Sequence, residues 1–192
     1  MKLETYLPPQ NVIDNMRTIT PKGIIVHHTA GAETSSPEDI NHWFVVGRAA
    51  EGYVWCGYHA LIYPDGTVAQ MRPFNRNGGH CPGYNNTHIG ISFVGNYELK
   101  DITDEAWEAY SDLVIDLKNT YTIEDKDIIN HRDANLAIGA KPTLCPGKYL
   151  YKRLKTPLEP SVQPVATNTA RTLSDYTTVE LLQELTRRYD KN

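Results

Sequence analysis

The sequence predicts an α/β domain in which one β-sheet is covered by a few packed helices. Short runs of β-branched residues alternate along the chain with segments whose apolar residues recur at helical spacing. The 192 residues are enough for one ordinary domain with a hydrophobic core and a small extra element. Hydrophobic residues make up 40% of the chain and charged residues 22%, which is typical of a globular protein.

The first predicted strand and helix lie within residues 23–47. Residues 23–26 are a short run rich in β-branched side chains, which indicates a buried strand that ends at two adjacent histidines. A helix should then begin near Pro37, because a serine precedes the proline and two acidic residues follow it. Ile40, Trp43 and Phe44 share one face of this helix, so we expect all three in the core.

Two strand-like runs follow, at 58–63 and 67–70, on either side of an Asp-Gly turn, and they predict a β-hairpin. Residues 88–94 predict a further strand, and residues 127–130 predict a short one that delivers His131. The clearest helix is expected at 103–121, where Thr103 caps an apolar stripe at helical spacing. Residues 149–154 predict the last helix of the domain, which we place at residues 1–155.

The chain changes character after this domain. Residues 156–172 contain three prolines and little apolar content, so they are predicted to form a linker. Residues 173–192 contain a capping-box pattern followed by an amphipathic segment, which predicts a short C-terminal helix. Such a helix is too short to fold alone, so it would dock on the domain, on a partner or on a second copy of the chain. Self-association through this helix is therefore one of the open alternatives.

Charge and composition exclude several classes of protein. The formal net charge of −4 argues against a nucleic-acid-binding protein, which would usually carry a basic face. No apolar run approaches the roughly 18 residues of a membrane span, so we expect no membrane partner. The first ten residues do not resemble a secretory signal peptide. Three cysteines, an odd number, make a disulfide framework unexpected and leave at least one thiol for another purpose.

His27, His131 and Cys145 are the candidates for a metal centre. His27 and His131 each follow a predicted buried strand, and imidazole and thiolate are the ligands that zinc prefers. Because neighbouring residues of a strand point to opposite faces, only one of His27 and His28 can face a given site. Three ligands would leave an open catalytic position, whereas a fourth would make the site structural. On spacing alone that fourth ligand could be one of five residues: His28, His59, His80, Cys56 or Cys81.

Five sequence motifs in order narrow the interpretation. They are IVHHTAG at 25–31, GYHALIYPDGTV at 57–68, HCPGYNNTHIGISFVGNY at 80–97, NHRD at 130–133 and TLCPG at 143–147. Over residues 22–150 the chain resembles the N-acetylmuramoyl-L-alanine amidase family of phage endolysins, bacterial autolysins and peptidoglycan recognition proteins. The resemblance implies a mixed sheet with helices packed against it and zinc in a surface groove. It also implies hydrolysis of the amide between N-acetylmuramic acid and L-alanine in bacterial peptidoglycan.

The resemblance also implies roles for individual residues. The zinc ligands would be His27, His131 and Cys145, with Tyr58 beside the metal as a catalytic residue. Substrate would be bound by residues of the third motif: His80, Tyr84 and Asn85. A lysine or threonine two residues before the cysteine completes the site in this family. Thr143 stands at that position.

The segment between His131 and Cys145 contains residues that many relatives lack. It also holds Lys141, so either Lys141 or Thr143 could assist catalysis, and the spacing favours Thr143. Asp133 could orient His131 or could be a surface turn residue.

Several functions remain open from the sequence. The leading one is a zinc amidase acting as a phage or prophage endolysin, made in the host cytoplasm and released onto the cell wall. The alternatives are a peptidoglycan-binding module without activity, a cytoplasmic amidase that recycles muropeptides, an autolysin exported by another route, a cysteine hydrolase using Cys145 and His131, and a structural zinc protein.

Overall fold

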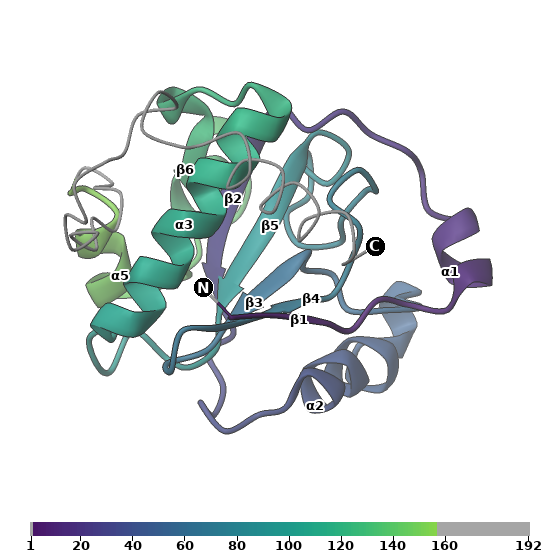
Figure 1. Ribbon diagram of the computed structural model, residues 1–192, viewed down its shortest axis with the longest axis horizontal. Coiled ribbons are helices and arrows are strands. Elements are labelled where there is room, and N and C mark those ends of the chain that lie inside the picture. The colour runs from purple at the N-terminus through teal and green to yellow at the C-terminus, as the bar shows by residue number, and fades with distance from the viewer. Residues whose placement is uncertain (1, 157–192) are drawn as a thin grey trace, which may run out of the picture. The chain divides into compact units, whose positions relative to one another are not determined.

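The computed structural model of the protein describes residues 2–156, coloured in Figure 1. Apart from Thr156, the predicted linker at 156–172 and the predicted helix at 173–192 lie outside the described residues.

Within residues 2–156, six strands form one mixed sheet (Figure 1). The strands are β1 (Lys2–Thr5), β2 (Gly23–His28), β3 (Ala60–Ile62), β4 (Thr67–Gln70), β5 (His88–Phe93) and β6 (Ile128–Asn130). Their order across the sheet is β1-β4-β3-β5-β2-β6. The hairpin partners β3 and β4 are antiparallel, and the other neighbouring strands run parallel. The predicted hairpin and the strands predicted at 23–26, 88–94 and 127–130 are confirmed.

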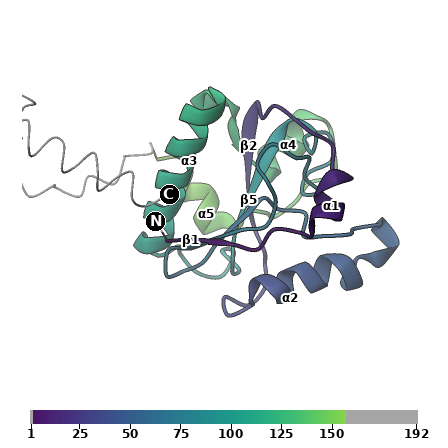
Figure 2. The same ribbon diagram turned by 45° about the vertical axis from the view of Figure 1, so that its right-hand side comes forward.

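Helices cover both faces of the sheet. The described helices are α1 (Gln10–Asp14), α2 (Pro37–His42), the π-helical turn η1 (Trp43–Gly47), the 3₁₀ turn η2 (Ala49–Glu51), α3 (Asp104–Tyr121), the 3₁₀ turn η3 (Asp125–Asp127), α4 (His131–Ala137) and α5 (Lys148–Arg153). In Figure 2, α3 and α5 lie to the left of β2 and β5, while α4 and α1 lie to the right. None of the helices within the described residues is long and apolar enough to cross a bilayer.

The main core lies between α3 and the sheet. The Thr103 hydroxyl accepts a hydrogen bond of 3.2 Å from the Ala106 amide, so the predicted cap and helix are confirmed. The predicted apolar stripe of α3 is buried against alternate residues of the strands, among them Val26, Ile62 and Phe93. A second cluster, which includes Phe44 and Leu61, fills the opposite face.

The alternation along β2 decides where its two histidines point. Val26 belongs to the core under α3, whereas Ile25 packs with Cys81 and Ala134 on the other face. Because side chains alternate with a period of two, His27 shares the face of Ile25 and His28 shares the face of Val26. Strand β2 therefore directs His27 away from α3.

Four features differ from the expectation or were missed. Trp43 is 53% exposed, so its predicted place in the core is wrong. Ile40 and Phe44, four residues apart, are buried as predicted. At Trp43 the helix widens into a π-helical turn. Strand β1 was missed because its burial shows no apolar alternation and it pairs only along the β4 edge. Helices α1 and α4 were missed because each is short; α1 buries no residue.

Candidate metal centre

Two neighbouring parallel strands bring His27 and His131 together. Strands β2 and β6 pair in register with Val26 opposite Asn130. The next residue of β2 is His27, and the next residue after β6 is His131, which begins α4. Their imidazole rings consequently lie at the same edge of the sheet, with ring centroids 4.6 Å apart.

A loop after α4 supplies the third residue. Cys145 lies with its Sγ 3.7 Å from His27 Nδ1, and the backbone N–H of His28 donates to the same sulfur at 3.5 Å. The Thr143 hydroxyl accepts a hydrogen bond of 3.1 Å from the Cys145 amide, which holds the loop in this position. One ligand atom each from His27, His131 and Cys145 lies within 4.8 Å of the others.

The donor set suits a zinc ion. Zinc binds imidazole nitrogen at about 2.0–2.1 Å and thiolate sulfur at about 2.3 Å in a tetrahedron, so the nitrogen and sulfur would be roughly 3.6 Å apart. The separation between His27 Nδ1 and Cys145 Sγ is 3.7 Å. The group that could hold a metal within residues 2–156 has three members, which leaves a tetrahedral position open.

Burial disfavours the charged form of all three groups. It lowers the pKa of the His27 imidazole well below its usual value, and the neighbouring histidines His80, His131 and His28 lower it further. Burial also lowers the pKa of His131. It raises the pKa of the Cys145 thiol to about 12. Because a metal-bound cysteine is a thiolate, binding of a metal at these residues would release a proton.

Tyr58 lies against the same centre. Its ring centroid is 5.2 Å from that of His27, and Phe44 packs edge-on against its other side at 5.3 Å. Burial raises the pKa of the Tyr58 phenol, and the adjacent Cys145 raises it further. Tyr58 is therefore a neutral hydroxyl that can donate a hydrogen bond beside the three candidate ligands.

Residues 17–148 match the family described as N-acetylmuramoyl-L-alanine amidase. The chain belongs to this amidase family. Relatives with related sequences include peptidoglycan recognition protein 1 of Bos indicus, 33% identical over 140 residues that cover 67% of this chain and 68% of the relative. Peptidoglycan-recognition protein SD of Drosophila simulans is 27% identical over 148 residues, covering 75% and 76%.

Solved structures of an amidase, an endolysin and a peptidoglycan recognition protein share the fold. The N-acetylmuramoyl-L-alanine amidase LysC from Clostridium intestinale is 26% identical with a TM-score of 0.62, over 79% of this chain and 95% of that one. The Ph2119 endolysin of a Thermus scotoductus bacteriophage has a TM-score of 0.63 at 24% identity, over 79% and 96%. Drosophila PGRP-LB has a TM-score of 0.66 at 20% identity, over 81% and 94%. The expected family and the expected mixed sheet with packed helices are thereby confirmed.

The three residues expected to bind substrate make internal contacts in this amidase fold. His80 is buried, with its Nδ1 3.0 Å from His27 Nε2. The Asn85 side chain accepts hydrogen bonds from the amides of His80 and Cys81, at 2.7 and 2.8 Å. Tyr84 is half-buried and packs edge-on against His88. The geometry gives His80 and Asn85 supporting positions behind the centre, and the substrate contacts expected from their motif stay a prediction.

Three further candidates for a fourth ligand, and the two candidates for an assisting side chain, are placed as follows. His28 points to the α3 face, where its Nδ1 accepts a hydrogen bond from the Tyr97 amide. Cys56 and Cys81 are fully buried, and burial raises the pKa of their thiols to about 12 and about 11. Lys141 is exposed, and its backbone carbonyl accepts from Asn135, whereas Thr143 touches Cys145 through the bond described above.

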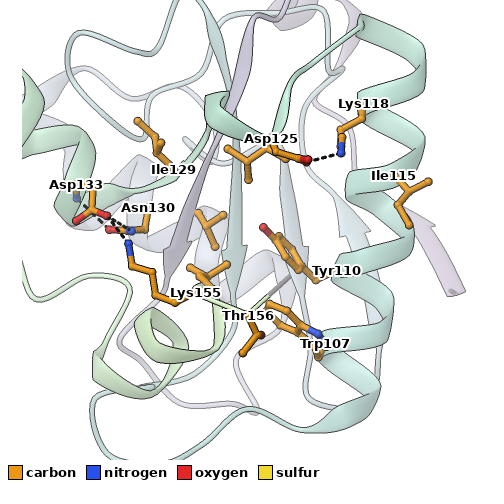
Figure 3. Close-up of a pocket in the computed structure, with 13 residues that line it drawn as sticks. Trp107, Tyr110, Ile115, Lys118, Asp125, Ile129, Asn130, Asp133, Lys155 and Thr156 are labelled. Carbon is orange, nitrogen blue, oxygen red and sulfur yellow. Dashed lines mark hydrogen bonds and ion pairs between the residues drawn. The ribbon is translucent and has the colours of Figure 1, made fainter. Parts of the chain in front are cut away.

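The Asp133 side chain bonds to the residue that caps α4 and not to His131. Its amide and carboxylate exchange hydrogen bonds with the Asn130 side chain at the start of α4, and Lys155 bonds the same carboxylate at 3.2 Å. These residues line a cavity of about 690 Å³ that also includes Val26, Trp107 and Tyr110 (Figure 3). Because Val26 faces α3, this cavity lies on the opposite face of the sheet from His27.

A hollow next to Tyr58 was not anticipated from the sequence. It measures about 410 Å³ and is lined by Thr29, Ala30, Gly31, Ser35, Asp39, Ile40, Trp43 and Tyr58. The exposed Trp43 ring contributes an apolar wall, and Asp39 a charged one. The π-helical turn that exposes Trp43 is the feature that creates this wall, and no pattern in the sequence signals it.

The buried His59 gives the domain a pH-dependent stability. Its Nε2 lies 2.7 Å from the Arg76 carbonyl and its Nδ1 accepts from the Gly90 amide, and burial lowers its pKa to about 4. The unfolded chain takes up this proton near pH 6.5, so the free energy of unfolding should fall as pH drops from 6.5 to 4, by roughly 3 kcal/mol from His59 alone. Chemical denaturation of wild type and His59→Gln at pH 7 and pH 4.5 measures the difference. An equal loss in both proteins would contradict this assignment.

Proposed function

We propose that this protein is a zinc-dependent N-acetylmuramoyl-L-alanine amidase that cleaves bacterial peptidoglycan. The observation that carries the proposal is the meeting of His27, His131 and Cys145 within 4.8 Å beside Tyr58. Membership of the amidase family and likeness to the amidase LysC support it. The bond cleaved would be the amide between the lactyl group of N-acetylmuramic acid and L-alanine.

The reaction would divide between the metal and the residues around it. Zinc, held by His27, His131 and Cys145, would supply a Lewis acid that lowers the pKa of water from 15.7 to roughly 7. The protonated Tyr58 hydroxyl would donate a hydrogen bond to the oxygen that becomes negative as the amide carbonyl is attacked. Thr143 would act by holding the Cys145 loop, as its hydrogen bond to the Cys145 amide supports.

The hollow beside Tyr58 is the proposed substrate groove. Its volume of about 410 Å³ and its position against Tyr58 would place a bound chain next to the metal. A sugar ring presents an apolar face that packs on an aromatic ring, and Trp43 offers one that is 53% exposed. Peptidoglycan, in which sugars and short peptides alternate, suits a groove with apolar and polar walls.

Two alternatives to a metal amidase are weaker. The names of some relatives, which are recognition proteins, favour a binding module without activity. Such a module, however, has no need of a complete set of zinc ligands. A cysteine hydrolase would need a reactive thiolate, whereas burial raises the pKa of Cys145 to about 12. The full set of ligands with Tyr58 beside it favours the metal enzyme.

For the biological setting we propose a phage or prophage endolysin, made in the host cytoplasm and released onto the wall. The likeness to LysC and to the Ph2119 endolysin supports this setting. The competing setting is a cytoplasmic amidase that recycles muropeptides. Activity on intact cell-wall sacculi would favour the endolysin, and activity restricted to soluble muropeptides would favour recycling.

The deciding experiment uses purified peptidoglycan and the full chain, with and without a zinc chelator. Mass spectrometry identifies the new chain ends. We expect free L-alanine amino termini that disappear with chelator and return when zinc is added. Turnover that survives the chelator and is stopped by a thiol-alkylating reagent would overturn the metal mechanism. Binding of the protein to peptidoglycan without any cleavage would identify a recognition module.

A further inference from the structure

The His80 side chain occupies a closed position behind the metal centre. The residue is 8% exposed, and both of its ring nitrogens have partners inside the protein. Nδ1 lies 3.0 Å from His27 Nε2, and Nε2 lies 3.1 Å from the backbone carbonyl oxygen of His88. Neither nitrogen is left for a substrate group, so the role of His80 has to be sought in these two contacts.

The carbonyl of His88 fixes the direction of both hydrogen bonds. A carbonyl oxygen only accepts, so the neutral His80 ring must carry its hydrogen on Nε2. Its Nδ1 is then an acceptor, and His27 Nε2 must donate to it. The hydrogen of His27 consequently sits on Nε2. His27 Nδ1 keeps its lone pair, and this is the atom that faces Cys145 Sγ at 3.7 Å.

Two glycines and an asparagine hold His80 in this orientation. A Cβ atom at Gly90 would lie 2.4 Å from His80 Cγ, and a Cβ atom at Gly78 would lie 2.4 Å from His80 Cδ2. The imidazole therefore packs directly against backbone that no larger residue could provide. The Asn85 side chain fixes the backbone of His80, because its oxygen accepts a hydrogen bond of 2.7 Å from the His80 amide. Ring and backbone are both constrained.

We propose that His80 is a positioning residue that selects the tautomer and orientation in which His27 binds the metal. The chain of contacts runs from the His88 carbonyl through His80 to His27, and it presents the His27 Nδ1 lone pair to the centre. A metal-bound histidine commonly donates its other ring hydrogen to a fixed acceptor, and loss of that partner weakens metal binding. This inference rests on the proposed function, because it requires a metal at His27.

Two substitutions separate the two contacts of His80. His80→Asn places a carbonyl oxygen near the position of Nδ1, so it can still accept from His27. His80→Gln reaches the position of Nε2, so it can still donate to the His88 carbonyl but leaves His27 without its acceptor. We expect the zinc dissociation constant, measured by competition with a chromophoric chelator, to rise about 10–100-fold in His80→Gln and to stay within about threefold in His80→Asn.

His59→Gln is the matched control. His59 is a buried histidine whose two ring nitrogens both bond to backbone, the Arg76 carbonyl and the Gly90 amide; it packs against His80 with ring centroids 5.7 Å apart but bonds to none of the three candidate ligands. It should lose stability without loss of zinc affinity. Equal zinc affinity in His80→Gln and His80→Asn would overturn the positioning role. Failure of the wild type to bind zinc at all would instead refute the proposed function.

If a variant does not fold, a measurement on the wild-type protein also tests whether His80 selects the tautomer of His27. Two-bond ¹H–¹⁵N correlation spectra of the histidine rings report which nitrogen carries the hydrogen. We expect the Nε2–H form for both His80 and His27. The Nδ1–H form at His80 would overturn the proposal, because its Nδ1 could not then accept from His27.

Discussion

Cys145→Ala is expected to abolish both zinc binding and cleavage of peptidoglycan. The substitution removes one of three ligands, the one whose sulfur lies 3.7 Å from His27 Nδ1. Two imidazoles alone hold zinc weakly, and without the ion the attacking water returns toward its ordinary pKa. We expect kcat/KM to fall by more than about 10³-fold, with the zinc content of the purified protein falling in parallel. Metal analysis and release of L-alanine termini measure the two effects.

Two further variants show whether the loss of activity in Cys145→Ala comes from the loss of a zinc ligand. Cys81→Ala removes another buried thiol, whose sulfur contacts the Pro82 carbonyl and the Asn135 side chain at 3.8 Å, and the variant should keep zinc and activity. Cys145→Asp replaces the thiolate by a carboxylate, which zinc also accepts. It should recover part of the zinc binding and part of the turnover. A cysteine nucleophile predicts no turnover in Cys145→Asp, so zinc-loaded but inactive protein would argue against the metal mechanism.

Tyr58→Phe is expected to reduce kcat by about 10²–10³-fold while leaving zinc affinity unchanged. The phenol is neutral because burial raises its pKa, so it serves as a donor throughout the usual pH range. Only the hydroxyl is removed, and the ring can still pack against Phe44 and His27. The measurement compares the change in kcat with the change in zinc affinity. Loss of the hydroxyl from a merely structural tyrosine would change neither quantity.

Tyr53→Phe is the matched control for this variant. The Tyr53 ring also packs against Phe44, at 5.0 Å, but its hydroxyl donates to the Gly79 carbonyl and not toward the metal centre. We expect it to cost about 1 kcal/mol of stability and to leave kcat unchanged. Full activity in Tyr58→Phe, or an equal fall of kcat in both variants, would remove Tyr58 from the proposed mechanism.

The fold was predictable where local patterns and burial agree. The strand before His27 and the long helix α3 were predicted because uninterrupted apolar runs and a helical stripe are both buried in the structure. Strand β1 escaped because its residues are mostly exposed and it exists through pairing with β4. Helix α4 escaped because its start is set by His131 and the Asn130 cap, which look like a loop in the sequence.

The candidate site was predictable in its ligands and less so in its surroundings. The motif words identified His27, His131 and Cys145, and the structure brings these three together. The position of His80 required coordinates, because its contact with His27 joins residues 53 positions apart. Trp43 was assigned to the core because an ideal helix would bury it, but a π-helical turn begins at this residue and its ring is exposed.

The three candidate ligands are held by different kinds of structure. His27 lies in β2 and His131 directly follows β6, so the distance between them is set by the pairing of these two strands. Cys145 instead lies in the loop between α4 and α5, outside the sheet. A protein engineer seeking a different metal preference would accordingly vary residues 138–144 and leave the strands untouched.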